Sequence, residues 1–335
     1  MHYRQEAFER GEALMAKIPR VELGVWPTPL QRMERFGEKV GAPVWIKRDD
    51  LNGLGPGGNK VRSLEYLLWA ARENGADTVI ASGPAQSNLC TLAACAAAKL
   101  GMEAVLVHNA AAPDRLEGNA LLNHLAGAQS HYIGAGTTEF DRADRVAELE
   151  MGLRAKGREP YTVLLGASTG LGALGYVRVV SELVDQCRQQ KAELEHLFVP
   201  GGNGGVAAGI VYGNWLLGSP FQVHVISVEY DRKDLSREMR RIWEEIAPII
   251  GVPLEAEMDA LCDLRDEYRG AGWGQNTPES TAMTETLPKL EGIFIENVYN
   301  SKVVVALADY AAQGLLEGGA CYLHTGGFGS LFAQY

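Results

Sequence analysis

Short runs of β-branched and apolar residues alternate along the chain with longer segments in which apolar residues recur every three or four positions. The short runs predict strands, and the longer segments predict amphipathic helices. The helical pattern is clearest at Val61, Leu64, Leu68 and Ala71. Five predicted strands, each followed by a helical segment, read TVIASG (78–83), EAVLVHN (103–109), YTVLLGAS (161–168), LEHLFVPGG (194–202) and FQVHVISVEY (221–230).

Strands that are joined through helices have to pair in parallel, with right-handed crossovers. We therefore predict an α/β protein with open, mostly parallel sheets flanked by helices. Ligands of such sheets lie beyond the carboxyl ends of the strands. This rule directs attention to three segments that follow predicted strands, namely residues 84–88, 167–172 and 201–205.

Composition narrows the function. A chain of 335 residues favours two domains. The net charge of −11 argues against nucleic acid or an anionic membrane as the main partner, and no run of 18 apolar residues predicts a membrane span. The charged first twenty residues lack the apolar stretch of a signal peptide, and the five cysteines form no Cys-x-x-Cys pair, so we expect a cytoplasmic protein. The seven histidines show no metal-ligand spacing, so we expect no metal site.

The segment GLGPGGNKVRSLEYLL (53–68) places Lys60 where a glycine-rich loop becomes a helix. Two interpretations are open. The exposed N–H groups of the helix N-terminus attract anions, so the loop could hold a phosphate with Lys60 as its counter-charge. Alternatively, Lys60 is a reactive amine that forms a Schiff base.

A second loop, GGNGGVAAG (201–209), also follows a strand and opens a helix. A tight turn and a phosphate site are both compatible with it. Gly202, Gly204 and Ala207 also fit the G-x-G-x-x-A dinucleotide pattern, with Glu229 available for a ribose hydroxyl. Two further partial matches in this glycine-rich chain show that the pattern is weak. An NAD-binding oxidoreductase is the alternative from another enzyme class.

Three other segments have ordinary structural interpretations. Ser87 or Asn88 in QSN would cap a helix, Tyr299 in IENVYNSK would be an aromatic residue at a strand end, and HTGG (324–327) would be a turn.

The order WIKRDD…GGNK…QSN…GALGY…GGNGG…ENVY…HTGGFGSLF resembles the D-cysteine desulfhydrase and 1-aminocyclopropane-1-carboxylate (ACC) deaminase family. The likeness runs from about Val25 to the C-terminus. It implies pyridoxal phosphate (PLP) as cofactor and PLP fold type II, which is the fold of the tryptophan synthase β-subunit. It also implies a homodimer.

The resemblance implies a role for each site residue. Lys60 would carry PLP as a Schiff base, Asn88 would bind its phenolic oxygen and Thr325 its pyridine nitrogen. Ser87 and Tyr299 would face the substrate as catalytic residues. The PLP phosphate would bind the loop of Gly201, Gly202, Asn203, Gly204 and Gly205.

The resemblance also divides the chain into a large PLP-binding domain (1–54 plus 167–335) and a small domain (55–166) that carries Lys60, Ser87 and Asn88. The implied reaction is α,β-elimination from a small β-substituted amino acid such as D-cysteine, which gives pyruvate, ammonia and sulfide. ACC deamination to 2-oxobutyrate and cleavage of L-cysteate are alternatives, and a non-catalytic PLP carrier is a third class.

The chain departs from the family pattern at several positions. Asn203 and Val206 replace hydroxyl residues of the phosphate loop, and Val61 and Ser63 replace a threonine and a lysine. Leu89 replaces a polar residue that holds the substrate carboxylate in relatives. Two further positions differ from the ACC deaminases, which have glutamate in place of Asn300 and leucine in place of Thr325. These differences favour desulfhydrase over ACC deaminase activity.

Overall fold

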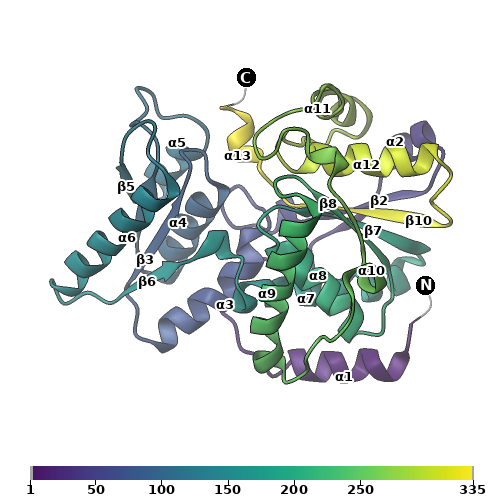
Figure 1. Cartoon of the computed structure of the whole chain (residues 1–335), viewed down its shortest axis with the longest axis horizontal. Coiled ribbons are helices and arrows are strands. Elements are labelled where there is room, and N and C mark those ends of the chain that lie inside the picture. Colours follow the sequence, from purple (N-terminus) through teal and green to yellow (C-terminus); the bar gives the residue numbers. More distant parts are fainter. Residues whose placement is uncertain (1–2, 334–335) are drawn as a thin grey trace.

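The computed structural model describes residues 3–333 and contains two sheets that lie side by side (Figure 1). The smaller sheet, in blue and teal in Figure 1, has the order β5-β4-β3-β6, and all of its neighbouring strands are parallel. The larger sheet has the order β1-β2-β10-β7-β8-β9, and only the β1–β2 pair is antiparallel. The predicted α/β class with mostly parallel sheets is confirmed.

The strands are short, and their bounds agree with most of the predicted runs. Those of the smaller sheet are β3 (Thr78–Gly83), β4 (Glu103–His108), β5 (Gln129–Tyr132) and β6 (Pro160–Val163). Those of the larger sheet are β1 (Leu30–Arg32), β2 (Val44–Arg48), β7 (Leu194–Gly201), β8 (Gln222–Ser227), β9 (Asp263–Arg265) and β10 (Gly319–His324). The predicted strand at 161–168 is too long, because the chain leaves β6 after Val163 and makes a 3-10 turn at Leu165–Ala167.

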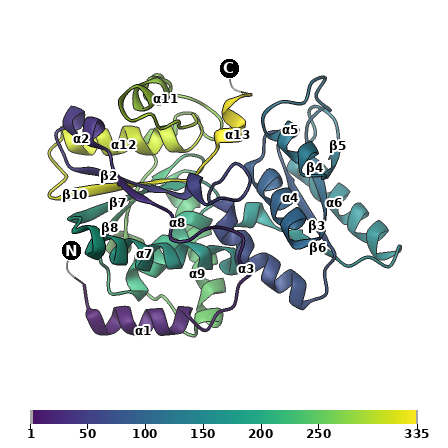
Figure 2. The same ribbon diagram turned by 180° about the vertical axis from the view of Figure 1, so that it is seen from behind.

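Helices cover both faces of each sheet (Figures 1 and 2). Four helices cover one face of the larger sheet: α1 (Gln5–Met15), α7 (Gly170–Gln190), α8 (Gly205–Leu216) and α9 (Arg232–Ile250). Three helices cover its other face: α2 (Glu34–Val40), α11 (Pro278–Glu291) and α12 (Asn300–Ala312). Around the smaller sheet lie α4 (Asn88–Leu100), α5 (Gly118–Leu125) and α6 (Glu139–Arg154). Two short helices are α10 (Met258–Leu261) and α13 (Phe328–Leu331). No helix within residues 3–333 is both long enough and apolar enough to cross a membrane.

The helix α3 (Lys60–Glu73) joins the two halves, because it packs on α7 of one and on α4 of the other. Its predicted apolar face is confirmed, since Val61, Leu64, Leu68 and Ala71 are all fully buried. All four strands of the smaller sheet lie within residues 55–166. The domain boundaries at residues 54 and 167 stay a prediction, and residues 1–2 and 334–335 of the predicted large domain lie outside the described residues.

A buried ionic network fastens α3 to the larger sheet. The Arg62 guanidinium donates to both carboxylate oxygens of Asp49, at 2.7 and 2.8 Å, and to both of Glu182, at 2.8 and 2.9 Å. The Lys47 ammonium lies 3.0 Å from the Glu182 carboxylate. The two cations hold the pKa of Glu182 at about 2 against the effect of its burial. Because Arg62 is two residues from Lys60, this network also fixes the start of the helix.

Replacing Arg62 by methionine should lower the free energy of unfolding by about 3–5 kcal/mol, because it leaves the buried Asp49 carboxylate without its cation. Urea titration of the purified protein measures this change. The control is Arg154→Met, whose side chain is half exposed and pairs with Glu150 and Glu159 on the surface. That loss should cost about 0–1 kcal/mol. Equal effects of the two substitutions would contradict a special role for the buried network.

Candidate active site

A cavity of about 360 Å³ lies between the carboxyl ends of the two sets of strands. Its walls come from the segments after β3, β6, β7, β8 and β10 and from the starts of α3, α4, α8 and α12. The three segments that the strand-end rule indicated contribute residues to it. The sequence-predicted residues that line the cavity are Lys60, Ser87, Asn88, Gly202, Asn203, Gly204, Gly205, Tyr299 and Thr325. Gly201 differs, since it is the last residue of β7 and does not line the cavity.

Lys60 is the first residue of α3, and a glycine turn brings it into the cavity. Gly57 has φ = 74°, and a Cβ there would lie 1.8 Å from the Asp50 carbonyl oxygen, so only glycine fits this turn. The Lys60 amine donates to the Gly166 carbonyl at 2.8 Å. Burial lowers the pKa of Lys60 to about 8, although the Glu229 carboxylate opposes the shift. The share of neutral amine near physiological pH is therefore far greater than for an ordinary lysine, although the protonated form still predominates.

Ser87 and Asn88 come from the turn between β3 and α4. Ser87 is the N-cap of α4 and accepts a hydrogen bond from the Cys90 amide at 3.3 Å, so the capping interpretation is confirmed. The Asn88 carbonyl oxygen accepts from the Asn119 amide group at 2.8 Å, which fixes the Asn88 side chain. The next residue, Leu89, also lines the cavity. The turn thus offers one hydroxyl and one amide to a ligand.

The glycine loop after β7 leads directly into α8, so the N-terminus of that helix opens on the cavity. A Cβ at Gly205 would lie 2.8 Å from the Ser168 hydroxyl oxygen, and one at Gly202 would lie 3.1 Å from the Tyr299 ring. Gly204 has φ = 86°. The loop therefore leaves little or no room for side chains at these positions, and the first N–H groups of a helix have no partner within the helix. This arrangement suits an anion such as a phosphate.

Thr325 follows β10 and is held by one side chain, Asn300. The Asn300 carbonyl oxygen accepts from the Thr325 amide at 3.0 Å, from its hydroxyl at 3.2 Å and from the Tyr322 hydroxyl at 2.7 Å. The Asn300 amide group donates to the Glu296 carboxylate and to the Gly326 carbonyl, both at 2.8 Å. The residue that departs from the ACC deaminase pattern thus orients the residue predicted to contact the pyridine ring.

Tyr299 is the N-cap residue of α12, and the predicted strand end at this position is wrong. The apolar run before it reads as a strand, but the Glu296 carboxylate accepts from the amides of Val298, Tyr299 and Asn300 and turns the chain into the helix. The Tyr299 hydroxyl oxygen accepts from the Trp273 indole N–H at 2.6 Å. Burial raises the pKa of Tyr299, so the phenol keeps its proton.

Several cavity residues were not identified as site residues from the sequence. Glu229, considered for a ribose hydroxyl, lies after β8 and interacts electrostatically with Lys60. Trp273 belongs to the loop before α11, while Glu139 and Arg142 come from α6. The GAGWG sequence around Trp273 was the available signal, because glycines beside one large aromatic residue suggest a shaped loop.

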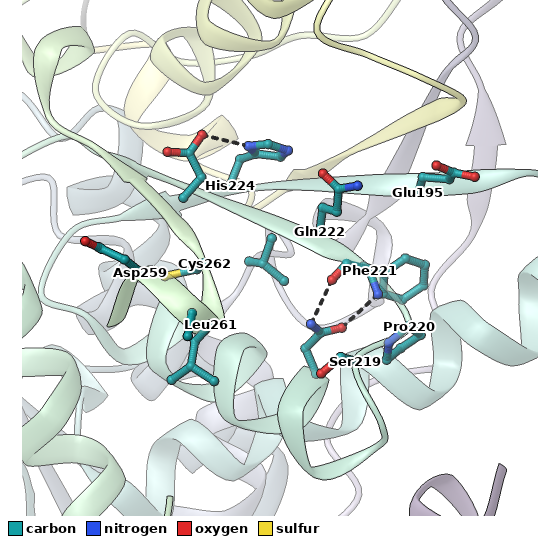
Figure 3. Close-up of a pocket in the computed structure, with 13 residues that line it drawn as sticks. Glu195, Ser219, Pro220, Phe221, Gln222, His224, Asp259, Leu261 and Cys262 are labelled. Atoms are coloured by element: carbon teal, nitrogen blue, oxygen red, sulfur yellow. Dashed lines mark hydrogen bonds and ion pairs between the residues drawn. The ribbon is translucent and has the colours of Figure 1, made fainter. Parts of the chain in front are cut away.

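A second cavity of about 470 Å³ lies at the far edge of the larger sheet and is lined by residues of β8, β9 and α10 (Figure 3). None of the sequence-predicted site residues lines it. Two of its polar side chains are committed to partners within the cavity wall: the Asn214 amide exchanges two hydrogen bonds with the Phe221 backbone, and His224 bonds to Asp263 at 3.2 Å. No group of three or more metal-ligating side chains occurs in the described part of the chain. The smaller cavity is therefore the candidate active site.

The chemistry of the smaller cavity fits PLP. A partly neutral lysine amine suits a Schiff base, and the glycine loop suits a phosphate. Asn88 and Thr325 line the same cavity and provide neutral hydrogen-bonding groups for the cofactor ring. The Lys60 loop and the Thr325 turn are also in contact, because the Asn59 amide donates to the Thr325 carbonyl at 3.0 Å. The groups that the resemblance assigned to one cofactor are thus collected around one cavity.

Comparisons with known proteins agree with this chemistry. A family model described as pyridoxal-phosphate dependent enzyme matches residues 21–326. A protein of Pyrococcus horikoshii with the provisional name ACC deaminase is 35% identical over 320 residues, which are 96% of this chain and 95% of the relative. D-cysteine desulfhydrase of Klebsiella pneumoniae is 35% identical over 328 residues, which are 96% of this chain and 98% of that enzyme.

Solved structures give the same result. The crystal structure of an ACC deaminase homologue has a TM-score of 0.87 and 34% identity, with 99% of this chain and 97% of that chain covered. The processed form of threonine deaminase isoform 2 from Solanum lycopersicum has a TM-score of 0.66 at 15% identity, with 97% and 90% covered, and shows likeness of fold alone. The predicted PLP fold type II is confirmed, and the comparisons favour PLP over a nicotinamide cofactor.

Replacing Glu229 by glutamine should lower the pKa of Lys60 further, because the carboxylate is the charge that opposes the effect of burial. The neutral amine is the reactive form, so the rate of PLP attachment to the cofactor-free protein should rise with pH through about 8 in the wild type. In the variant the rise should occur at lower pH. Stopped-flow absorbance of added PLP across the pH range measures both curves.

The matched control is Glu139→Gln, which removes a carboxylate that lines the same cavity but is 84% exposed. Its curve should coincide with that of the wild type. A Glu229→Gln curve that also coincides with the wild type would contradict the interaction between Glu229 and Lys60.

Proposed function

This chain belongs to the PLP-dependent enzymes, in the family of D-cysteine desulfhydrase and ACC deaminase, and we propose that it catalyses α,β-elimination from a small β-substituted amino acid such as D-cysteine. The products would be pyruvate, ammonia and sulfide. The main observation behind this proposal is that Lys60, Ser87 and Tyr299 line the same cavity, so one amine and two hydroxyls are available to one ligand. When bound, PLP withdraws electrons from the α-carbon of the substrate and so makes its proton removable.

The cofactor would be held by residues from both sides of the cavity. We assign the phosphate to the N–H groups of Gly202, Asn203, Gly204 and Gly205 at the start of α8, and we withdraw the direct role predicted for Gly201, which does not line the cavity. Asn88, whose side chain is oriented by Asn119, would bind the phenolic oxygen. Lys60 would make the covalent attachment.

Thr325 would present a neutral hydroxyl to the ring nitrogen. A carboxylate at this position would stabilise a proton on the nitrogen, whereas a hydroxyl does not. The weaker electron withdrawal favours prompt departure of the β-substituent over a long-lived carbanion. The Thr325 amide donates to Asn300 at 3.0 Å and fixes the residue at the cavity wall, and the Thr325 hydroxyl, which donates to Asn300 at 3.2 Å, would turn its hydrogen to the ring nitrogen when PLP is bound.

The proton transfers would be divided between Lys60 and Tyr299. The neutral Lys60 amine would take the proton from the substrate α-carbon while the bond from the β-carbon to sulfur breaks. Tyr299, protonated because burial raises its pKa, would give a proton to the departing sulfur. Ser87 would orient the substrate from the α4 side of the cavity. The released 2-aminoacrylate would hydrolyse to pyruvate and ammonia.

ACC deaminase activity is the second candidate, because both the Pyrococcus relative and the solved homologue carry that name. The structure gives a reason to rank it second. Asn300 has an amide in place of the carboxylate expected for ACC deaminases, and its five hydrogen bonds commit that amide to Glu296, Tyr322, Thr325 and Gly326.

The assembly and location are also proposals. We propose a homodimer, since the exposed Phe328 ring contacts the exposed rings of Phe294 and Phe332 in an apolar cluster that a second copy could cover. A cytoplasmic location is supported by the five cysteines, all of which are free. The net charge of −11 supports a small-molecule substrate over nucleic acid or a membrane as the main partner.

Borohydride reduction should fix PLP irreversibly onto Lys60, because reduction converts a Schiff base into a stable secondary amine. Peptide mass spectrometry of the reduced protein should find the adduct on Lys60, and Lys60→Ala should carry none. Lys99 serves as the internal control, since its amine donates to the Leu23 carbonyl away from the cavity. An adduct on another lysine, or a nicotinamide cofactor in the purified protein, would overturn the assignment.

A substrate panel should separate the candidate reactions. We expect pyruvate from D-cysteine and β-chloro-D-alanine, and less or none from L-cysteine, L-cysteate and D-serine. Formation of 2-oxobutyrate from ACC alone would make the second candidate correct, and sulfite from L-cysteate would identify a sulfo-lyase. The absence of a keto acid from every compound would refute the proposed elimination. Tyr299→Phe should reduce kcat for D-cysteine by about 10²-fold, the usual scale for a general acid.

A further inference from the structure

We propose that Trp273 is a positioning residue that makes Tyr299 a proton donor toward the leaving group. This inference rests on the proposed elimination reaction, but the hydrogen bond behind it can be tested without turnover. Trp273 lines the cavity and is 44% exposed, so its ring lies at the boundary between the cavity and solvent. Its indole N–H lies 2.6 Å from the Tyr299 hydroxyl oxygen.

The loop that carries Trp273 has a defined shape. Gly270, Gly272 and Gly274 have φ values of 64°, 127° and 70°, which residues with side chains rarely adopt. A Cβ at Gly270 would also lie 3.0 Å from the Thr277 methyl group. The alternation of glycines therefore bends the loop around the one large side chain between them. This local geometry directs the indole to a particular place at the cavity rim.

The same helix positions both partners of the hydrogen bond. Tyr299 is the N-cap residue of α12, and Lys302 lies in the first turn of that helix. The Lys302 ammonium donates to the Arg269 carbonyl at 2.7 Å and to the Gly272 carbonyl at 3.2 Å, and its residue is 1% exposed. A buried cation thus ties the loop of Trp273 to the helix of Tyr299. The distance between the Trp273 indole and the Tyr299 phenol is consequently set by α12, which carries Tyr299 and, through Lys302, anchors the loop of Trp273.

The direction of the hydrogen bond follows from the chemistry of the two groups. An indole N–H can only donate, whereas a phenol hydroxyl can accept and donate. The Tyr299 oxygen therefore accepts from Trp273, and its own proton has to point elsewhere. The carboxylates of Glu229 and Glu296 stand close enough to disfavour a negative charge on Tyr299. Tyr299 is thus held as a protonated phenol whose hydrogen is available to a ligand in the cavity.

This arrangement has a chemical consequence for the elimination step. As the bond between the β-carbon and sulfur breaks with both electrons on sulfur, the Tyr299 proton moves to the departing hydrosulfide, which leaves as hydrogen sulfide. The phenolate that remains is stabilised by the Trp273 N–H. It regains a proton from solvent, and Lys60 releases the proton that it took from the α-carbon, so the site returns to its starting state. A chloride leaving group needs no proton and should not depend on this pair.

The first test compares Trp273→Phe with the wild type on two substrates. The substitution keeps an aromatic ring but removes the N–H, so kcat/KM for D-cysteine should fall by about 10- to 100-fold. Turnover of β-chloro-D-alanine should change by no more than roughly twofold. Tyr299→Phe should show the same selectivity, and the double variant should lose little more than either single variant. Equal losses on both substrates would indicate a structural role only and overturn the proposal.

The matched control is Trp69→Phe, which changes a tryptophan of α3 that packs in the core around the smaller sheet. It should leave both activities unchanged. A loss like that of Trp273→Phe would show that the assay reports on folding rather than on the hydrogen bond.

The second test needs no substrate. The chain has six tryptophans, so a ¹⁵N correlation spectrum of the holoenzyme should contain six indole signals. The signal that disappears in Trp273→Phe should shift upfield in Tyr299→Phe, because its N–H loses its acceptor. An unmoved signal would refute the hydrogen bond itself. If the signal moves but no compound of the panel yields a keto acid, the bond stands and the elimination reaction is what fails.

Discussion

The position of the reactive lysine depends on a buried ion pair two residues away. Arg62 is 3% exposed, Asp49 is fully buried, and the bidentate contact between them ties the start of α3 to the end of β2. A guanidinium in such a place is stable only while its carboxylates remain, so the helix cannot slide or rotate without exposing a buried charge. Because Lys60 is the first residue of the same helix, its position is fixed as well. The glycine turn before it then sets the direction in which the amine enters the cavity.

A second, smaller constraint organises the opposite wall. The Glu296 carboxylate accepts from three successive amides at the start of α12, and Asn300 extends from that helix to Thr325. The side chain proposed to contact the ring nitrogen and the phenol proposed as the acid are thus fixed by adjacent residues. Because Asn300 and Thr325 are neutral side chains, this wall could face the ring nitrogen of the cofactor without stabilising a proton on it.

Local signals in the sequence were sufficient for much of this architecture. β-Branched runs and helical periodicity gave five strands and the buried face of α3, because these patterns depend on neighbours in sequence. The strand-end rule located the cavity, since it follows from parallel topology. Only the interpretation of Tyr299 as a strand-end aromatic is wrong, because the apolar run before it resembles a strand whereas the buried Glu296 carboxylate turns the chain into α12. Trp273 was missed because its partner is 26 residues away and their contact depends on the anchoring of a loop by Lys302.

One physical effect explains how the site can contain both a base and an acid. Removal from water disfavours whichever form of a group is charged. For Lys60 the charged form is the protonated one, so burial lowers its pKa and frees the amine. For Tyr299 the charged form is the deprotonated one, so the same burial raises its pKa and retains the proton. Burial in one cavity therefore makes Lys60 a proton acceptor and Tyr299 a proton donor. The Glu229 carboxylate opposes the lowering of the Lys60 pKa and adds to the raising of the Tyr299 pKa.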